Sequence, residues 1–336
     1  MMLSGIRRLV LVGMVILAAV PFGSAAAPPS ACLAVGDSLA AGVGSTLPRE
    51  RSAAALLCEW ASTYWGEKSE LVSLAVPGER TESFLRGGQA ERLRQTVARL
   101  RAEGRAIRFV LISLGGNDLL QLRAADEVER EEQLAAFEAN YAEAMRVIRS
   151  AVGDVPLLAL TLYDPTEGDA RAPRSDSWWI AQFDRAIRAG AESVGALVVD
   201  LDKEFRGRTG EWTWWPVDIH PTNAGYAAIA RAAWRALAWD RQAPQVVIER
   251  PEAGSRVERR FLTVRARISD LGGIERVGLW VDGQEIGTLD PLPGADEWIT
   301  LWETPWPLPG PPLRLEVRAV DRAGNEGRAA VELVRP

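Results

Sequence analysis

Between residues 31 and 239, short apolar segments alternate with longer segments of helical periodicity. Residues 107–114 form the clearest strand candidate, an apolar run rich in β-branched side chains of the kind buried on both faces of a sheet. Residues 89–103 form a clear helix candidate, with apolar positions at helical spacing among Arg and Glu. Strands that alternate with helices predict an α/β fold, in which helices cover both faces of a parallel sheet. The other strand candidates are residues 31–35, 71–75, 155–162 and 196–201, and the other helix candidates are 52–65, 131–150, 177–193 and 223–239.

The sequence GDSL occupies residues 36–39, directly after the first strand candidate. In a parallel sheet, ligands bind at the carboxyl ends of the strands. A serine hydroxyl is a poor nucleophile unless a base removes its proton during the attack. In a strand-to-helix turn, Ser38 would be exposed, with main-chain N–H groups facing a developing oxyanion. Ser38 is therefore a candidate nucleophile, although a serine at such a turn also serves as a helix cap.

Two further segments end strand candidates at the same edge of the sheet. The sequence GGND at residues 115–118 follows the central strand candidate, and its Asn117 offers an N–H donor of the kind that an oxyanion hole requires. Gly78 follows the second strand candidate and could present its main-chain N–H close to a substrate, because it has no side chain. Glycine and asparagine also favour ordinary turns, so neither segment is specific alone.

His220 is the only histidine in the chain, and it precedes the last helix candidate in the sequence VDIHP, residues 217–221. A lone histidine is often a structural residue. Here Asp218 lies two positions earlier, and the residue before Pro221 is expected to be extended. Side chains two apart in an extended segment point the same way, so Asp218 could bond the ring nitrogen opposite the one that serves Ser38.

Taken together, GDSL, the glycine after the second strand, GGND and D-x-HP in this order resemble the SGNH/GDSL hydrolase family of serine esterases and lipases. The resemblance spans roughly Cys32 to Trp239. It implies a flavodoxin-like three-layer α/β/α sandwich with a parallel sheet. It also implies that Ser38 is the nucleophile and His220 the base. Ser38, Gly78 and Asn117 would form the oxyanion hole, with no metal and no cofactor.

The chain departs from the family pattern beside His220. The family usually has its acid three residues before the histidine, where this chain has Val217. Asp218, at minus two, is the favoured orienting acid, and a Ser–His dyad oriented by a main-chain carbonyl is the alternative.

The composition changes near residues 243–244, and short alternating runs separated by turn signals follow. This pattern predicts an immunoglobulin-like β-sandwich over residues 244–336, after a catalytic domain over 28–242. Three segments carry a resemblance to bacterial immunoglobulin-like modules: VDG at 281–283, WET at 302–304 and AVDRAGN at 319–325. The resemblance implies a spacer or adhesion unit, with possible contact to a cell surface or polysaccharide.

Residues 1–27 have the pattern of a signal peptide, with two arginines, about a dozen apolar residues and then small residues. The apolar stretch is shorter than the roughly 20 residues needed to span a bilayer, although an uncleaved anchor is the alternative. We therefore expect a secreted or extracytoplasmic protein. The formal net charge of −6 argues against nucleic acid as a partner.

Cys32 and Cys58 are the only cysteines, and they could form a disulfide in an oxidising compartment or remain as buried free thiols. With a single histidine they supply too few ligands at zinc spacing. Asp and His are also too sparse for the two-metal site of a phosphoesterase.

The resemblance predicts hydrolysis of a small-molecule or glycan ester. Tryptophans at 178–179 and in residues 212–215 could line an acyl pocket, stack on sugar rings or simply pack. The alternatives to a general esterase or lipase are a carbohydrate O-acetyl esterase and a surface-binding protein with an inert hydrolase domain.

Overall fold

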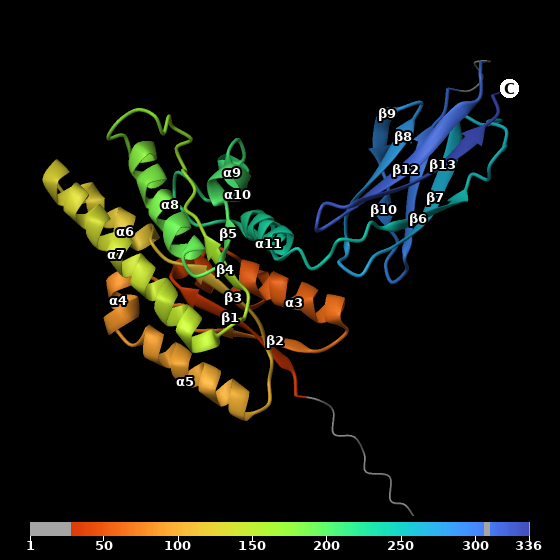
Figure 1. The fold of residues 1–336 in the computed structure, drawn as a ribbon. Helices are drawn as coiled ribbons and strands as arrows, with labels where there is room; N and C mark the ends of the chain where they lie inside the picture. Colours follow the sequence, from red (N-terminus) through yellow and green to blue (C-terminus); the bar gives the residue numbers. More distant parts are fainter. Residues whose placement is uncertain (1–27, 306–309, 336) are drawn as a thin grey trace, which may run out of the picture.

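The computed structural model describes residues 28–305 and 310–335 (Figure 1). The predicted signal peptide, residues 1–27, lies outside these ranges. Within them, no helix combines the length and apolarity needed to cross a membrane.

The N-terminal part is built on a five-stranded sheet in which every neighbouring pair is parallel. Its strands are β1 (Ser30–Gly36), β2 (Ser69–Ser73), β3 (Ile107–Ser113), β4 (Leu157–Leu160) and β5 (Leu197–Val199). They lie in the order β2-β1-β3-β4-β5, which is the flavodoxin-like order. The predicted α/β class and strand arrangement are confirmed.

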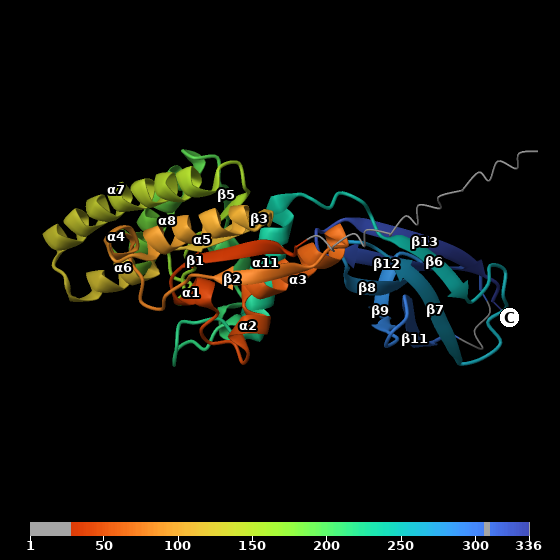
Figure 2. The same ribbon diagram turned by 90° about the horizontal axis from the view of Figure 1, so that it is seen from below.

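Helices cover both faces of this sheet (Figures 1 and 2). The long helices α5 (Gln89–Ala102), α7 (Glu127–Val152) and α8 (Asp176–Glu192) bury their apolar residues in one core. On the opposite face, α3 (Ala53–Trp65) and α11 (Asn223–Leu237) form a second core. The shorter helices are α1 (Ser38–Ala41), α2 (Pro48–Arg51), α4 (Thr81–Arg86), α6 (Gly116–Gln121), η1 (Leu122–Ala124), α9 (Leu201–Phe205) and α10 (Thr209–Trp212).

Strand β1 shows why this sequence needs two helical layers. All seven of its residues are buried. Leu33 and Val35 belong to the core on the α5 side, whereas Cys32 and Ala34 belong to the core on the α3 side. Because successive side chains of a strand point to opposite faces, a fully apolar strand is stable only when both faces are covered.

Helix α7 begins four residues before the predicted start at residue 131. The reason is a capping box, in which Asp126 accepts the N–H of Glu129 at 3.0 Å and the Glu129 carboxylate accepts the N–H of Asp126 at 3.1 Å. The charged first turns carry no apolar stripe, so the hydrophobic periodicity alone placed the boundary too late.

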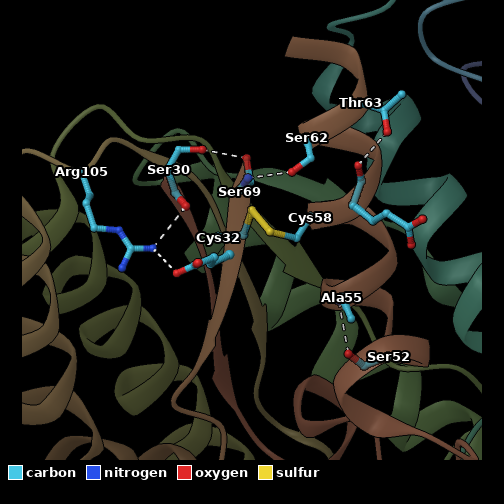
Figure 3. The surroundings of a disulfide bond; sticks show 11 residues. Ser30, Cys32, Ser52, Ala55, Cys58, Ser62, Thr63, Ser69 and Arg105 are labelled. Atoms are coloured by element: carbon cyan, nitrogen blue, oxygen red, sulfur yellow. Dashed lines mark hydrogen bonds and ion pairs between the residues drawn. A yellow bond between two sulfur atoms is a disulfide. The ribbon is translucent and has the colours of Figure 1, made fainter. Parts of the chain in front are cut away.

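Cys32 and Cys58 form a disulfide that joins β1 to α3 (Figure 3). Their Cα atoms are 5.8 Å apart, and both residues are buried. Nearby, the Ser69 N–H donates to Ser62 Oγ at 2.7 Å, which ties the start of β2 to the same helix. The disulfide therefore links strand β1 to helix α3 within the second core.

The C-terminal part consists of two four-stranded antiparallel sheets, ordered β10-β11-β7-β6 and β13-β12-β8-β9. They enclose a separate apolar core and fit an immunoglobulin-like sandwich. Strand β9 has no apolar face, because all five of its residues are exposed. The strands are β6 (Gln245–Arg250), β7 (Phe261–Ser269), β8 (Ile274–Val281), β9 (Gln284–Thr288), β10 (Asp290–Pro291), β11 (Glu297–Glu303), β12 (Leu313–Asp321) and β13 (Glu326–Leu333).

Candidate active site

Ser38 is the first residue of α1, immediately beyond the carboxyl end of β1. The chain turns through Gly36, whose φ is +112° and whose backbone approaches β3 so closely that a Cβ would lie 1.8 Å from the Ser113 carbonyl oxygen. Only glycine fits there. Asp37 caps α1 by accepting the N–H of Leu39 at 3.0 Å. These contacts hold Ser38 at the edge of the sheet where the sequence predicted a ligand site.

The His220 side chain lies between Ser38 and Asp218. Its Nε2 is 2.8 Å from Ser38 Oγ, and its Nδ1 is 2.6 Å from Asp218 Oδ1. With the ring proton on Nδ1, the ring donates to the carboxylate and Nε2 accepts the serine hydroxyl. Burial by itself would raise the pKa of Asp218, but hydrogen bonds from the main chain and ring of His220 hold that pKa below its usual value. The three side chains have the geometry of a serine nucleophile, a base and an orienting acid.

The segment before Pro221 is bent, so the prediction of an extended segment was wrong. The carboxylate of Asp218 accepts the main-chain N–H of His220 at 3.0 Å and closes a local turn, a bond that Asp readily makes two residues ahead. The Tyr163 hydroxyl donates to the Ile219 carbonyl and anchors the same turn. Asp218 therefore reaches the ring through the turn and not through strand alternation.

Two of the three predicted oxyanion donors, Ser38 and Asn117, line one cavity. Asn117 lies on α6, and its side-chain amide donates one hydrogen to the Glu79 carbonyl at 2.9 Å, which leaves a second hydrogen for a ligand. Gly78 does not line the cavity and lies in the exposed turn after β2. In the described part of the chain, no acceptor bonds to the main-chain N–H of Ser38 or Gly78.

Polar residues that the sequence reasoning missed connect these motifs. Gln89 is fully buried, accepts the N–H of Gly36 at 2.6 Å, and donates to the Gly36 carbonyl at 3.0 Å and to the Glu79 carboxylate at 2.5 Å. Asp118 accepts the main-chain N–H of Thr81 at 3.1 Å and the Thr81 hydroxyl at 2.6 Å. These bonds join the GDSL turn, the Gly78 turn and the GGND loop. Asp118 was visible in its motif, whereas no local pattern marks Gln89.

Asp37 is a buried carboxyl group beside the candidate nucleophile. Burial raises its pKa to about 6, although hydrogen bonds from Ser113 and from the main chain of α1 oppose the shift. Its Oδ1 accepts the Ser113 hydroxyl at 2.8 Å and the N–H of Leu39 at 3.0 Å. Asp37 therefore links the turn that carries Ser38 to strand β3.

A cavity of about 210 Å³ opens beside Ser38 and His220. Of the tryptophans singled out in the sequence, Trp179 and Trp215 line it, whereas Trp212 packs edge-on against Phe205. The lining of the cavity is mainly apolar and includes Leu119, Leu122, Leu162, Trp179, Ile180 and Trp215.

Trp214 is half exposed and donates its indole N–H to the Gly44 carbonyl at 2.8 Å. Trp214 does not line the cavity. Among the described residues, the cluster with cation-binding spacing is Asp240, Asp270 and Asp321, which lies beyond the opposite end of α11.

Comparisons with known proteins are consistent with this arrangement. The model of the GDSL-like lipase/acylhydrolase family matches residues 34–228, and the model of a bacterial Ig domain matches residues 244–304. No curated protein matches the chain.

Several solved structures are similar at low identity. The lipase Lip_vut3 from a goat rumen metagenome is 23% identical, with a TM-score of 0.49 over 62% of this chain and 97% of that one. Axe2, an acetylxylan esterase from Geobacillus stearothermophilus, is 19% identical, with a TM-score of 0.49 over 63% of this chain and 95% of that one. LAE5, an α/β hydrolase enzyme from the metagenome of Lake Arreo, Spain, is 20% identical, with a TM-score of 0.42 over 62% of this chain and 94% of that one.

The family model covers the GDSL turn, the GGND loop and His220, and it extends over more than half of the chain. The chain therefore belongs to the GDSL-like lipase/acylhydrolase family.

Proposed function

We propose that this protein hydrolyses carboxylic esters with Ser38 as nucleophile, His220 as general base and Asp218 as orienting acid. The observation that carries the proposal is the unbroken line of contacts from Asp218 through the imidazole to Ser38 Oγ, at 2.6 and 2.8 Å. A serine hydroxyl becomes an effective nucleophile when such a base accepts its proton.

The reaction would proceed in two acyl-transfer steps. Nε2 of His220 takes the proton of Ser38 while Oγ attacks the ester carbonyl, and the tetrahedral intermediate collapses as the imidazolium protonates the leaving alcohol. Water, losing a proton to His220, then attacks the acyl carbonyl, the bond between Ser38 Oγ and the acyl group breaks, and the imidazolium returns its proton to Ser38 as the acid leaves. Because a protonated imidazole cannot accept the serine proton, activity should fall at acidic pH.

The negative charge that develops on the carbonyl oxygen needs hydrogen-bond donors. The main-chain N–H of Ser38, the second amide hydrogen of Asn117 and the main-chain N–H of Gly78 are the proposed donors. Ser38 and Asn117 are supported as donors by their position in the cavity lining. Gly78 is supported because its main-chain N–H has no acceptor among the described residues, and because Asn117 donates to the carbonyl of the next residue, Glu79.

The apolar cavity supports an ester with a hydrocarbon acyl chain as substrate, because such a lining favours apolar groups. A carbohydrate O-acetyl esterase is the second candidate. The observation in its favour is the half-exposed indole of Trp214, which lies beside Gly44 near His220 and could stack on a sugar ring.

We further propose that the protein is exported, on the strength of the leader-like composition of residues 1–27 and of a buried disulfide, which persists in oxidising compartments. The immunoglobulin-like part would then serve as a spacer or as a contact to a surface or polysaccharide.

The test is a hydrolysis series on p-nitrophenyl esters from acetate to palmitate, with wild type, Ser38→Ala and the control Ser193→Ala. Among the described residues, the hydroxyl of Ser193 bonds only to the Gly190 carbonyl at the end of α8. We expect Ser38→Ala to lose activity by at least about 10⁴-fold in kcat and the control to retain it.

An optimum at medium or long acyl chains would support the lipase-like function, and an optimum at acetate would favour the glycan esterase. Equal rates in wild type and Ser38→Ala would refute the serine mechanism. Absence of activity on every ester and on acetylated polysaccharides would favour a binding protein with an inert hydrolase domain.

A further inference from the structure

Three aspartates meet where the α/β part adjoins the immunoglobulin-like part. Asp240 lies three residues beyond the end of α11, Asp270 lies in the loop between β7 and β8, and Asp321 is the last residue of β12. One carboxylate oxygen of each lies within 4.8 Å of the others. The cluster thus combines one residue that follows the α/β part with two from the sandwich.

Asp240 and Asp321 are buried and Asp270 is half-buried, and one oxygen of the cluster has no hydrogen-bond partner among the described residues. Asp240 is 6% exposed and Asp321 is 1% exposed. Oδ1 of Asp240 accepts the N–H of Gln242 at 3.1 Å, but its Oδ2 is buried with no donor among the described residues. A Cβ at Gly272 would lie 1.9 Å from that Oδ2 and 3.2 Å from Asp270 Oδ1, so a side chain at position 272 would collide with the carboxylates.

Among the described residues, the three carboxylates form no salt bridge with a cationic side chain, but the charge of the largely buried Arg322 guanidinium interacts with that of Asp270. The nearest arginine in sequence, Arg322, donates to the Gly272 carbonyl at 3.2 Å and places its guanidinium 4.5 Å from the Trp60 ring centre. An unpaired buried charge is costly, so the cluster needs a cation or shared protons.

We propose that Asp240, Asp270 and Asp321 bind one calcium ion at the junction of the two parts. Oxygens that coordinate one Ca²⁺ at roughly 2.3–2.6 Å lie within about 5 Å of one another, which matches the cluster. The donors are carboxylate oxygens alone, and hard cations prefer such ligands. Calcium fits better than magnesium, because Mg²⁺ demands near-ideal octahedral geometry and keeps several of its waters.

The ion would fasten the sandwich to the end of α11. Other contacts also cross this junction: Arg231 pairs with Glu275 at 3.2 Å, Arg322 packs over Trp60, and the Asn325 side chain donates to the Asp240 carbonyl at 3.5 Å. A buried ion that bridges Asp240 to the loops of Asp270 and Asp321 would make the link far stiffer than a surface pair. The site is also separate from the candidate active site, because the 15 residues of α11, about 22 Å long, lie between His220 and Asp240.

The test uses the full chain after EDTA treatment, at pH 8, with calcium chloride as the ligand. Isothermal titration calorimetry measures binding, and thermal unfolding is followed in EDTA and in 10 mM calcium, taken as roughly 100 times Kd. The variant is Asp240→Asn, which keeps an acceptor for the N–H of Gln242. The matched control is Asp296→Asn, at an exposed aspartate of the sandwich.

We expect wild type and the control to bind one Ca²⁺ with a Kd of roughly 10⁻⁴ M, and their Tm to rise by about 5 °C in calcium. Asp240→Asn should bind at least tenfold more weakly. In EDTA it should melt at or above the wild-type Tm, because an amide removes repulsion and can donate to a neighbouring carboxylate. The Tm of Asp240→Asn would thus be at or above that of wild type in EDTA and below it in calcium. A variant with a folding defect would have the lower Tm in both conditions.

Absence of binding up to 10 mM calcium would overturn the proposal and leave shared protons as the means by which the cluster is stabilised. Unchanged calcium affinity in Asp240→Asn would overturn it as well. Ester hydrolysis well below Tm should be the same in EDTA and in calcium, so the outcome is independent of the proposed catalytic mechanism.

Discussion

The two ends of α11 carry aspartates in opposite electrostatic states. Before its first residue, Asp218 is partly exposed, and despite the opposing effect of burial its hydrogen bonds to His220 lower its pKa. Beyond its last residue, Asp240 packs against Asp270 and Asp321, and burial raises the pKa of Asp240. One helix thus separates a carboxylate that is held charged from one that is costly to charge.

This difference shows that hydrogen-bond donors decide what a carboxylate can do at each end. Asp218 receives an N–H and a ring proton, so its charge is available to stabilise an imidazolium. Asp240 receives one N–H on one oxygen and none on the other, so its charge is available to an external cation. The first arrangement suits proton transfer, and the second suits ion binding.

The largest effect should come from removing the charge of Asp218. In Asp218→Asn the amide can donate to Nδ1, which would place the ring proton on Nε2 and prevent it from accepting the serine proton. We expect kcat for a p-nitrophenyl ester to fall by roughly 10²–10⁴-fold. Steady-state kinetics of this variant and of the exposed neighbour Val217→Ala measure the effect. Near wild-type kcat in Asp218→Asn would instead favour the Ser–His dyad.

A third carboxylate extends the comparison to the interior of the α/β part. Asp184 on α8 is 7% exposed, and burial raises its pKa to about 7, although its Oδ1 accepts the N–H of Leu162 at 2.8 Å. Because the folded pKa is raised, the stability that it contributes is complete below the unfolded value near 3.9 and is lost as the pH rises through about 7.

Asp184→Asn keeps the acceptor without the charge. The variant should therefore have a free energy of unfolding roughly 1–3 kcal/mol above wild type at pH 8 and within about 0.5 kcal/mol of wild type at pH 4. Urea unfolding at the two pH values measures this, with the exposed Asp154→Asn as control. A stability difference that is the same at both pH values would show that burial does not set the charge state of Asp184.

The smallest effect should come from the ion pair that crosses the junction. Arg231 and Glu275 are partly exposed and lie 3.2 Å apart, so Arg231→Gln should cost only about 0.2–1 kcal/mol. Thermal unfolding in calcium measures it beside Asp240→Asn. If Arg231→Gln lowered Tm more than Asp240→Asn did, the surface pair and not the aspartate cluster would dominate the junction.

The sequence predicted the parts of this molecule that depend on local pattern. Every strand and long helix proposed for the α/β part is present, because buried strands and amphipathic helices each have a characteristic spacing of apolar residues. The motif residues Ser38, Asn117 and His220 could be named because their motifs adjoin recognisable elements and together resemble the GDSL family. Boundaries set by polar capping residues, such as the start of α7, were missed.

The sequence by itself thus determined the α/β class, the β-rich C-terminal part and the residues around which a site would form. Only the tertiary structure decided which partners they meet: the pairing of Cys32 with Cys58, the bonds of Gln89 to the GDSL turn, and the approach of Asp240, Asp270 and Asp321. The physical reason is that periodicity reports which face of an element is buried, whereas hydrogen bonds and charge pairs depend on distances between elements far apart in the chain.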